Sequence, residues 1–317
     1  MSSIGYTPRI LANSMIQDIV NQQTSMGTLE EQLSTGYKVN QPSDNPAEAA
    51  NILRLQSVYA RTQQYGSNAA DALGWLSTGN STMNQINSIL NQVQQLMLSV
   101  SSADLAGQQN ALNGIATQIS NDLQALVNLA NTQYNGQAIF AGTGTTGPAY
   151  SANGTYNGGG AAPTRTVSTG VQVSISVTGP ALFGPSPTSG PPPTNPPSAT
   201  GLLSSVPGNL GVLAQTVKDL QAGNVNAVET TDLGNLQSAV NQVEGQAAVL
   251  GANYQRAQEF STQAQNVQSA IDQELSSVQD VNLPKAITNL KNMENTYQSS
   301  LWALSQSILP SLAQYIG

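Results

Sequence analysis

Histidine and cysteine are absent from the 317 residues of this chain, and charged side chains make up only 8%. Without an imidazole or a thiol there is no serine or cysteine triad of the usual kind, no thiolate chemistry and no conventional zinc site. Nine Lys and Arg against seventeen Asp and Glu leave a net charge of −8. Nucleic-acid binding needs a basic footprint, so this composition argues against it. We therefore expect no enzyme, and no catalytic, cofactor-binding or metal-binding residues.

Export and membrane signals are also missing from the sequence. The first twelve residues have no cationic stretch followed by an apolar one, so we expect no cleaved secretory signal. No uncharged apolar run reaches ~18 residues, so we expect no membrane insertion. Composition leaves open both residence inside the cell and export by a route without a cleaved signal.

The strongest pattern present is a repeat of apolar residues that lie alternately three and four positions apart. It occupies four segments, at 12–33, 65–100, 233–278 and 283–315. A sustained period of 3.5 predicts long helices that pack through a narrow seam, as antiparallel coiled coils. The apolar seam positions of the two terminal segments are Ala12, Met15, Ile19, Met26, Leu29, Leu33, Leu283, Ile287, Leu290, Tyr297, Leu301, Leu304 and Ile308.

Local signals mark where these helices begin and end. Gly36 follows the first segment and is typical of a helix C-terminus. We expect Ser43 or Asp44 to cap the next helix, which should run to about residue 100, and Asn282 to cap the last one. Pro310 should end or kink the last helix, because proline lacks the N–H group and clashes with the preceding turn.

Residues 142–204 differ in composition from the rest of the chain. They contain twelve Gly, ten Pro and a single charged residue, Arg165. Alternating polar and apolar residues at 166–168 and 171–177 predict one or two short strands. The block has too few apolar residues for a large core of its own. We expect a small β-rich insertion that could be removed while the helices stay folded.

Two smaller features carry alternative interpretations. The run Gly142–Gly147 matches the spacing G-x-G-x-x-G, but no helix pattern and no acidic residue follow it, as a dinucleotide site would require. We interpret it as a glycine-rich turn. Trp75 and Trp302 are interpreted as packing residues. Glu294 falls on the last seam, where it could pair with a cation of a neighbouring subunit or stay solvated.

Several segments resemble the flagellin superfamily. Residues 33–52 are similar to the block in which a terminal helix ends in L-S-S/T-G and the next follows P-S/A-D-D/N-P/A. Residues 135–142, 251–256, 276–287 and 311–316 resemble later segments in the same order. Within the superfamily, the sequence around Pro42 and the segment 135–142 look more like the hook-associated protein 3 family than like flagellin itself.

The resemblance implies a structural subunit of the bacterial flagellum at the junction between hook and filament. Its implied partners are further copies of the chain in a tubular layer, hook-associated protein 1, flagellin and an export chaperone. It also implies an extracellular location, reached by type III export without a cleaved signal peptide. The terminal helices would polymerise, which makes the thirteen seam residues the expected assembly interface. Flagellin remains the alternative, followed by an unrelated helical adhesin or enzyme.

The predicted fold is therefore mainly α, a long antiparallel coiled-coil bundle built from both halves of the chain. We expect terminal polymerisation helices at 1–41 and 282–317, and a helical rod at 42–141 and 205–281 with a β-hairpin near 133–150. Residues 142–204 would form the small outer domain. We also expect the terminal helices to be disordered in the free monomer and to fold on assembly, because one partner helix offers them little burial.

Overall fold

The predicted fold class is confirmed by a computed structural model, which is dominated by long helices. The model describes residues 8–102, 107–144, 147–152, 154–184, 202–203, 205–206 and 209–316. The chain divides into two compact units, which we describe separately. The terminal unit contains Met1–Arg61 and Val267–Gly317, and the central unit contains Thr62–Asn266. No helix within the described ranges is long and apolar enough to cross a membrane.

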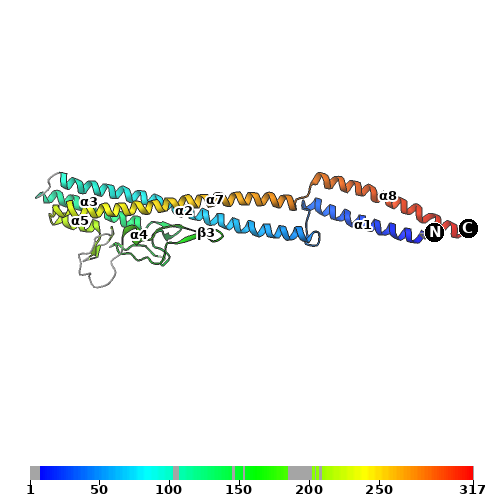
Figure 1. The fold of residues 1–317 in the computed structure, drawn as a ribbon, viewed down its shortest axis with the longest axis horizontal. Coiled ribbons are helices and arrows are strands. Elements are labelled where there is room, and N and C mark those ends of the chain that lie inside the picture. The colour runs from blue at the N-terminus through cyan, green and yellow to red at the C-terminus, as the bar shows by residue number, and fades with distance from the viewer. Residues whose placement is uncertain are drawn as a thin grey trace. The chain divides into compact units, whose positions relative to one another are not determined.

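Helices form most of the central unit, where α2, α3 and α7 run side by side (Figure 1). Two long helices, α2 (Pro46–Ser102) and α7 (Leu233–Gln279), contribute the parts of their length that lie within residues 62–266. The shorter ones are α3 (Gln109–Ala130), α5 (Val212–Gln221), α6 (Val225–Ala227) and the π-helical turn η1 (Val228–Asp232). The heptad pattern predicts α2 and α7 and does not mark the three short elements α5, α6 and η1.

The heptad pattern of the central unit is confirmed by burial. On α2, every predicted seam position from Ala69 to Val100 is buried, and Leu76 and Leu90 have no exposed surface. Leu236, Val243 and Leu250 of α7 are equally buried. Gly79 lies at the α2 seam, and a Cβ atom there would be 3.6 Å from Leu250. The two helices therefore pack through the seam that the spacing predicts.

The strands are short and pair locally as three antiparallel hairpins. The first joins β1 (Gln133–Tyr134) to β2 (Gln137–Ala138) through Asn135 and Gly136, which both have positive φ angles. Such angles suit a tight two-residue hairpin turn. The second pairs β3 (Thr164–Ser168) with β4 (Val171–Ser174), as the alternation predicts. The third pairs β5 (Ser205–Val206) with β6 (Asn209–Leu210).

The insertion shares its core with the helices. Ile175 and the Phe183 side chain from α4 (Gly179–Phe183) are buried in the same cluster as Leu90 of α2. The ring of Phe183 meets that of Phe140 edge to face, with 6.0 Å between the ring centres. The block thus lacks an independent core, as predicted. It buries its apolar side chains against the bundle, which argues against removing it without loss of helical stability.

Polar and aromatic side chains fix the second hairpin to α2. Arg165 donates from Nε to Asp71 Oδ2 at 2.7 Å, and its guanidinium lies 5.8 Å from the ring centre of Trp75. Asn68 donates from Nδ2 to the carbonyl of Thr166 at 2.7 Å. Trp75 is buried and contacts Tyr134, so its predicted packing role is confirmed. The one charge of the insertion therefore holds the hairpin in place.

The glycine-rich run is a site of close backbone packing. Gly144 donates to the carbonyl of Gly159 at 2.7 Å, and Gly159 donates to the carbonyl of Ala141 at 2.9 Å. A Cβ atom on Gly142 would lie 2.5 Å from the Gly159 oxygen, where no side chain fits. These glycines allow two backbone segments to touch, which agrees with the interpretation as a turn.

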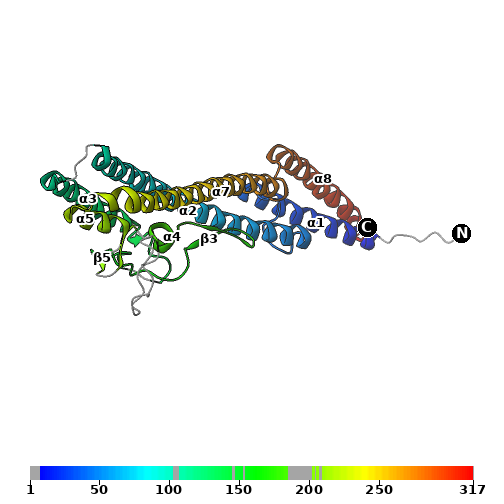
Figure 2. The ribbon, with the colours of Figure 1, turned by 60° about the vertical axis from the view of Figure 1, so that its left-hand side comes forward.

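The terminal unit is built around two long helices that run side by side in opposite directions. These are α1 (Pro8–Thr35) and α8 (Leu283–Ile316), which lie next to each other in both views (Figures 1 and 2). Of the two predicted effects of Pro310, to end or to kink the last helix, the first is wrong, because α8 continues to Ile316. The first residues of α2 and the last residues of α7 complete this unit.

Candidate assembly interface

A cluster of backbone hydrogen bonds at the C-terminal end of α1 positions α1 and α8. Gly36 ends α1 with a φ of +78° and donates to the carbonyl of Gln32 at 2.9 Å, as expected for a glycine at a helix C-terminus. Lys38 donates from its backbone to Gln279 at 2.7 Å, and Val281 donates to Gly36 at 2.9 Å. The end of α1 is therefore joined by hydrogen bonds to the segment between α7 and α8.

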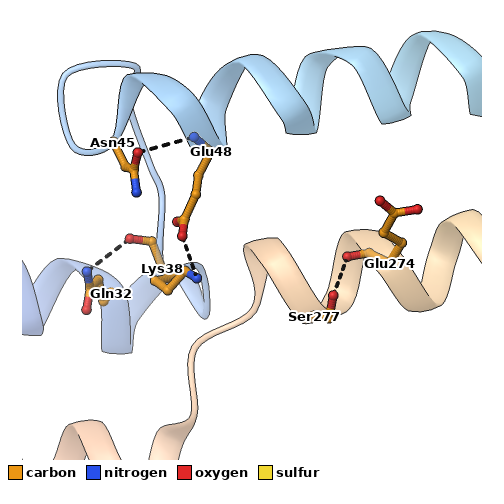
Figure 3. Close-up of polar contacts among 6 residues, drawn as sticks. All are labelled: Gln32, Lys38, Asn45, Glu48, Glu274 and Ser277. Atoms are coloured by element: carbon orange, nitrogen blue, oxygen red, sulfur yellow. Dashed lines mark hydrogen bonds and ion pairs between the residues drawn. The ribbon is translucent and has the colours of Figure 1, made fainter.

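Side chains add to this hydrogen-bond cluster (Figure 3). Gln32 donates from Nε2 to the carbonyl of Lys38 at 3.0 Å, and Lys38 Nζ pairs with Glu48 Oε1 at 3.2 Å. Beneath them lies a small apolar cluster of Val39, Ala49 and Ile52, against which Leu275 and Val278 pack. The hydrogen-bond cluster at the end of α1 is therefore supported by polar side chains and by a small apolar core.

The helix caps correct one prediction and confirm another. Asn45, rather than Ser43 or Asp44, caps α2, because its Oδ1 accepts from the backbone N–H of Glu48 at 3.2 Å. Asp44 instead accepts from two backbone N–H groups of the preceding turn, at 2.9 Å each, so it shapes the turn. Asn282 caps α8 as predicted, accepting from Lys285 at 3.1 Å.

The predicted seam of α1 faces α8 only in part. Ile19 is buried, whereas the other predicted residues whose side chains are described keep intermediate exposure. These residues are Met15, Met26, Leu29 and Leu33. The side chain of Ala12 lies outside the described residues. A single partner helix therefore covers this stripe incompletely.

The predicted seam of α8 splits into a covered and an exposed stripe. Leu290, Tyr297 and Leu304 are partly buried, as expected for a contact with α1. Leu283, Ile287 and Leu301 are exposed, by 47%, 47% and 42%. Ala286, which the pattern leaves out, is buried in their place. The side chain of Ile308 lies outside the described residues.

Two apolar stripes on one helix explain the difference. Ala286, Leu290, Met293 and Tyr297 lie four, three and four positions apart, which is the spacing of the predicted seam. They share Leu290 and Tyr297 with that seam, so both stripes satisfy the pattern. The sequence cannot tell which stripe the chain's own helix covers. Among the described side chains of the two helices, the exposed large apolar ones are Ile16, Val20, Leu283, Ile287, Leu301 and Trp302. Trp302, at 68% exposed, therefore does not pack as predicted.

Between α1 and α8 lies an open groove of about 590 Å³. Small and polar side chains line it, among them Ser25, Ser299, Ser300 and Ala303. Gln22, the polar member of the α1 seam, also lines it, and its Oε1 is buried without a hydrogen-bond partner. An unpaired buried acceptor costs about 1–3 kcal/mol, so this position is suited to receiving a donor from outside the chain.

These surfaces are suited to helix–helix association. Glu294 is exposed on α8, which leaves both interpretations of this residue open. The described residues hold no cluster of three or more side chains of the metal-binding kinds. Exposed apolar stripes on both helices, with an unfilled groove between them, form a surface that further helices could cover.

Comparison with known proteins gives two family-model matches and extensive sequence similarity. The model of the bacterial flagellin N-terminal helical region matches residues 8–145, and that of the C-terminal helical region matches 233–315. Flagellar hook-associated protein 3 of Escherichia coli K12 is 26% identical over 306 residues, which cover 95% of this chain and 96% of that protein. A flagellin of Salmonella rubislaw is 30% identical over 120 residues, 38% of this chain and 24% of the flagellin.

Solved structures show the same fold. The structure described as a putative flagellar hook-associated protein from Vibrio parahaemolyticus is similar with a TM-score of 0.60. The match covers 75% of this chain and all of that one, at 18% identity. At this identity, the similarity supports the helical architecture alone.

Proposed function

Because the chain belongs to the flagellin family, whose two helical models together match more than half of it, we propose that it forms the junction between hook and filament. In that role it is a structural subunit of the flagellum. The main support is the extent of similarity. The match to a hook-associated protein 3 spans nearly both whole chains, whereas the flagellin match covers a quarter of that flagellin.

The terminal unit supplies the surface on which such a subunit would assemble. Further copies of the chain would cover the exposed stripe of Ile287 and Leu301 on α8 and close the groove at Gln22. Covering a half-exposed large apolar side chain contributes on the order of 1 kcal/mol. Each further copy adds such contacts, so a closed layer is stabilised by more of them than a pair of copies is.

The proposed partners follow from the position in the flagellum. The layer would contact hook-associated protein 1 on the hook side and flagellin on the filament side, after an export chaperone has released the chain. The chain would act outside the cell, and type III export would carry it there without a cleaved signal. No catalytic step belongs to this role.

A layer-addition experiment separates the two flagellar roles. Purified chain is mixed with assembled hook-associated protein 1 and followed by electron microscopy and light scattering. A junction subunit adds one layer of limited length and then stops, although free subunits remain. A flagellin propagates into filaments, and that result would refute the junction role.

A pair of substitutions tests the proposed surface in the same experiment. Ile287→Asp combined with Leu301→Asp places two charges on the exposed stripe of α8 and should abolish layer addition. The matched control is Val249→Asp on α7 of the central unit, where the side chain is also about half exposed, at 47%. The control should assemble normally. Normal assembly of the double variant would show that the interface lies elsewhere.

A further inference from the structure

One buried acid of the central unit takes no part in the assembly surface. Asp232 is 2% exposed, and its Oδ2 has no hydrogen-bond partner. It ends the π-helical turn η1, which packs against α5. Such turns are rare and are frequently found at functional sites. An isolated charged carboxylate is very costly to bury, so this group needs either a counter-charge or a proton.

The surroundings of Asp232 supply no counter-charge. Asp219 on α5 is a second carboxyl group whose negative charge acts on Asp232. Lys218 on α5 and Glu229 on η1 are exposed, and α3, which packs against α5, carries Asp122 as its one titratable residue. The short helix α6 has no titratable side chain. No cation of these elements is therefore buried beside Asp232.

Hydrogen bonds distinguish the two acids. Asp219 accepts from Gln215 Nε2 at 2.6 Å through one oxygen and from Asn224 Nδ2 at 3.3 Å through the other. The Oδ2 atom of Asp232 is buried without a hydrogen-bond partner, so a negative charge on Asp232 is the less well compensated of the two. Asp232 is therefore the acid at which a bound proton relieves the larger cost of burial.

We propose that Asp232 and Asp219 form a proton-operated latch that holds α5 against η1 while Asp232 is protonated and loosens this packing when the proton leaves. Loss of the proton places a negative charge on a side chain that is only 2% exposed and on which the charge of Asp219 acts. The proton is the occupant rather than a calcium ion, since Ca²⁺ takes about six to eight oxygen ligands and the site offers two carboxyl groups.

The sign of the resulting pH dependence follows from the direction of the shift. Burial, followed by the charge of Asp219, raises the pKa of Asp232 to about 6. In the unfolded chain an Asp loses its proton near pH 4, at about 3.9. Between these values the folded chain holds a proton that the unfolded chain has released. The free energy of unfolding of the central unit therefore falls as pH rises through this window.

Carbon NMR of the full chain with labelled Asp carboxyl groups tests the latch directly. The Asp232 resonance, assigned by its loss in Asp232→Asn, should titrate near pH 6, about two pH units above the ordinary value of an Asp. Hydrogen exchange of the α5 amides, corrected for intrinsic rates, should accelerate above the same midpoint. The Asp232→Asn variant should lose this pH dependence, whereas the control Asp272→Asn should keep it.

The opposing outcomes are equally definite. An Asp232 titration at the ordinary value of an Asp would overturn the proposal. So would an α5 exchange rate that does not change across the midpoint. A shift of the Asp232 resonance on adding calcium chloride at neutral pH would identify a cation site in place of the latch. Should Asp232→Asn fail to fold, Asp219→Asn provides the second variant, in which the Asp232 midpoint should move downward.

Discussion

The two units of this chain bury their apolar residues to very different degrees. In the central unit, the seam of α2 is fully enclosed, and Leu76, Met83 and Leu90 have no exposed surface. In the terminal unit, Ile19 and Ala286 are the buried apolar residues among the described side chains of α1 and α8. Both units carry the same heptad spacing. The central unit therefore completes its own core, whereas the terminal unit leaves a core for other chains to complete.

This difference shows that heptad spacing indicates that a helix packs against other helices. It does not indicate whether those helices belong to the same chain or to another copy. In the central unit, α3, α7 and the insertion supply the partners from the same chain. In the terminal unit, α1 and α8 have each other, and the stripe of Leu283, Ile287 and Leu301 stays exposed. Helices that lack packing partners are marginal in water. Stability and assembly should therefore depend on separate parts of the molecule.

Hydrogen exchange of the dilute monomer gives the largest contrast between the units. We expect amides at Ile19 and Leu301 to exchange on the order of 10³ times faster than amides at Leu90 and Leu236. The first pair needs only local opening of α1 and α8, whereas the second needs global unfolding of the central unit. Mass spectrometry of peptides covering both units measures the ratio. Equal protection in both would remove the distinction, and assembly should reduce it.

A single truncation in each unit tests the same contrast by stability. Phe140→Ala removes a ring with no exposed surface and should lower the free energy of unfolding by about 3–5 kcal/mol. Tyr297→Ala on α8 removes a partly exposed ring and should change the main unfolding transition by less than about 0.5 kcal/mol. Urea unfolding followed by circular dichroism compares the two. A large effect of Tyr297→Ala would show that the units unfold together.

Much of the central unit could be predicted because its pattern has one solution. A single apolar stripe runs along α2 from Ala69 to Val100, so the buried face is unambiguous. The short elements could not be predicted in this way. At ten residues, α5 is too short for a sustained heptad, and η1 depends on tertiary packing around Asp232. The burial of Asp232 could not be predicted for the same reason, because nothing in the sequence distinguishes Asp232 from the exposed acidic residues.

The terminal unit could be predicted less well because its pattern has two solutions. On α8 the stripes through Ala286 and through Ile287 are both apolar, and the choice between them depends on where α1 lies. The prediction of the α2 cap was wrong for a related reason. Ser43, Asp44 and Asn45 are all good N-cap residues, and the turn that uses Asp44 as an acceptor leaves Asn45 for the helix. Local signals narrow the choice, and packing decides it.

The anchor of the insertion predicts an intermediate effect. Arg165→Ala removes the ion pair with Asp71 and the contact with Trp75, both at about one-third exposure of the charged groups. We expect a loss of about 1 kcal/mol from the unfolding free energy of the central unit. Arg165→Lys keeps the charge but not the planar guanidinium, so it should recover only part of the loss. No change in either variant would mean that Ile175 and Phe183 hold the insertion alone.

The smallest effects should come from the surface of the terminal unit. Arg54 and Glu274 form an ion pair at 3.9 Å with more than half of each side chain exposed. Such pairs contribute about 0–1 kcal/mol because water and salt screen them. Arg54→Ala should therefore leave both the unfolding transition and layer addition unchanged.

The matched comparison is Asn45→Ala, which removes the cap of α2 nearby and should cost about 1 kcal/mol in the same unit. If Arg54→Ala proved the more harmful of the two in layer addition, while both variants kept the monomer transition, Arg54 would be a contact between subunits. The assembly surface would then extend beyond α1 and α8 to the first turns of α2, and the terminal unit as a whole would be the part of the chain that other copies complete.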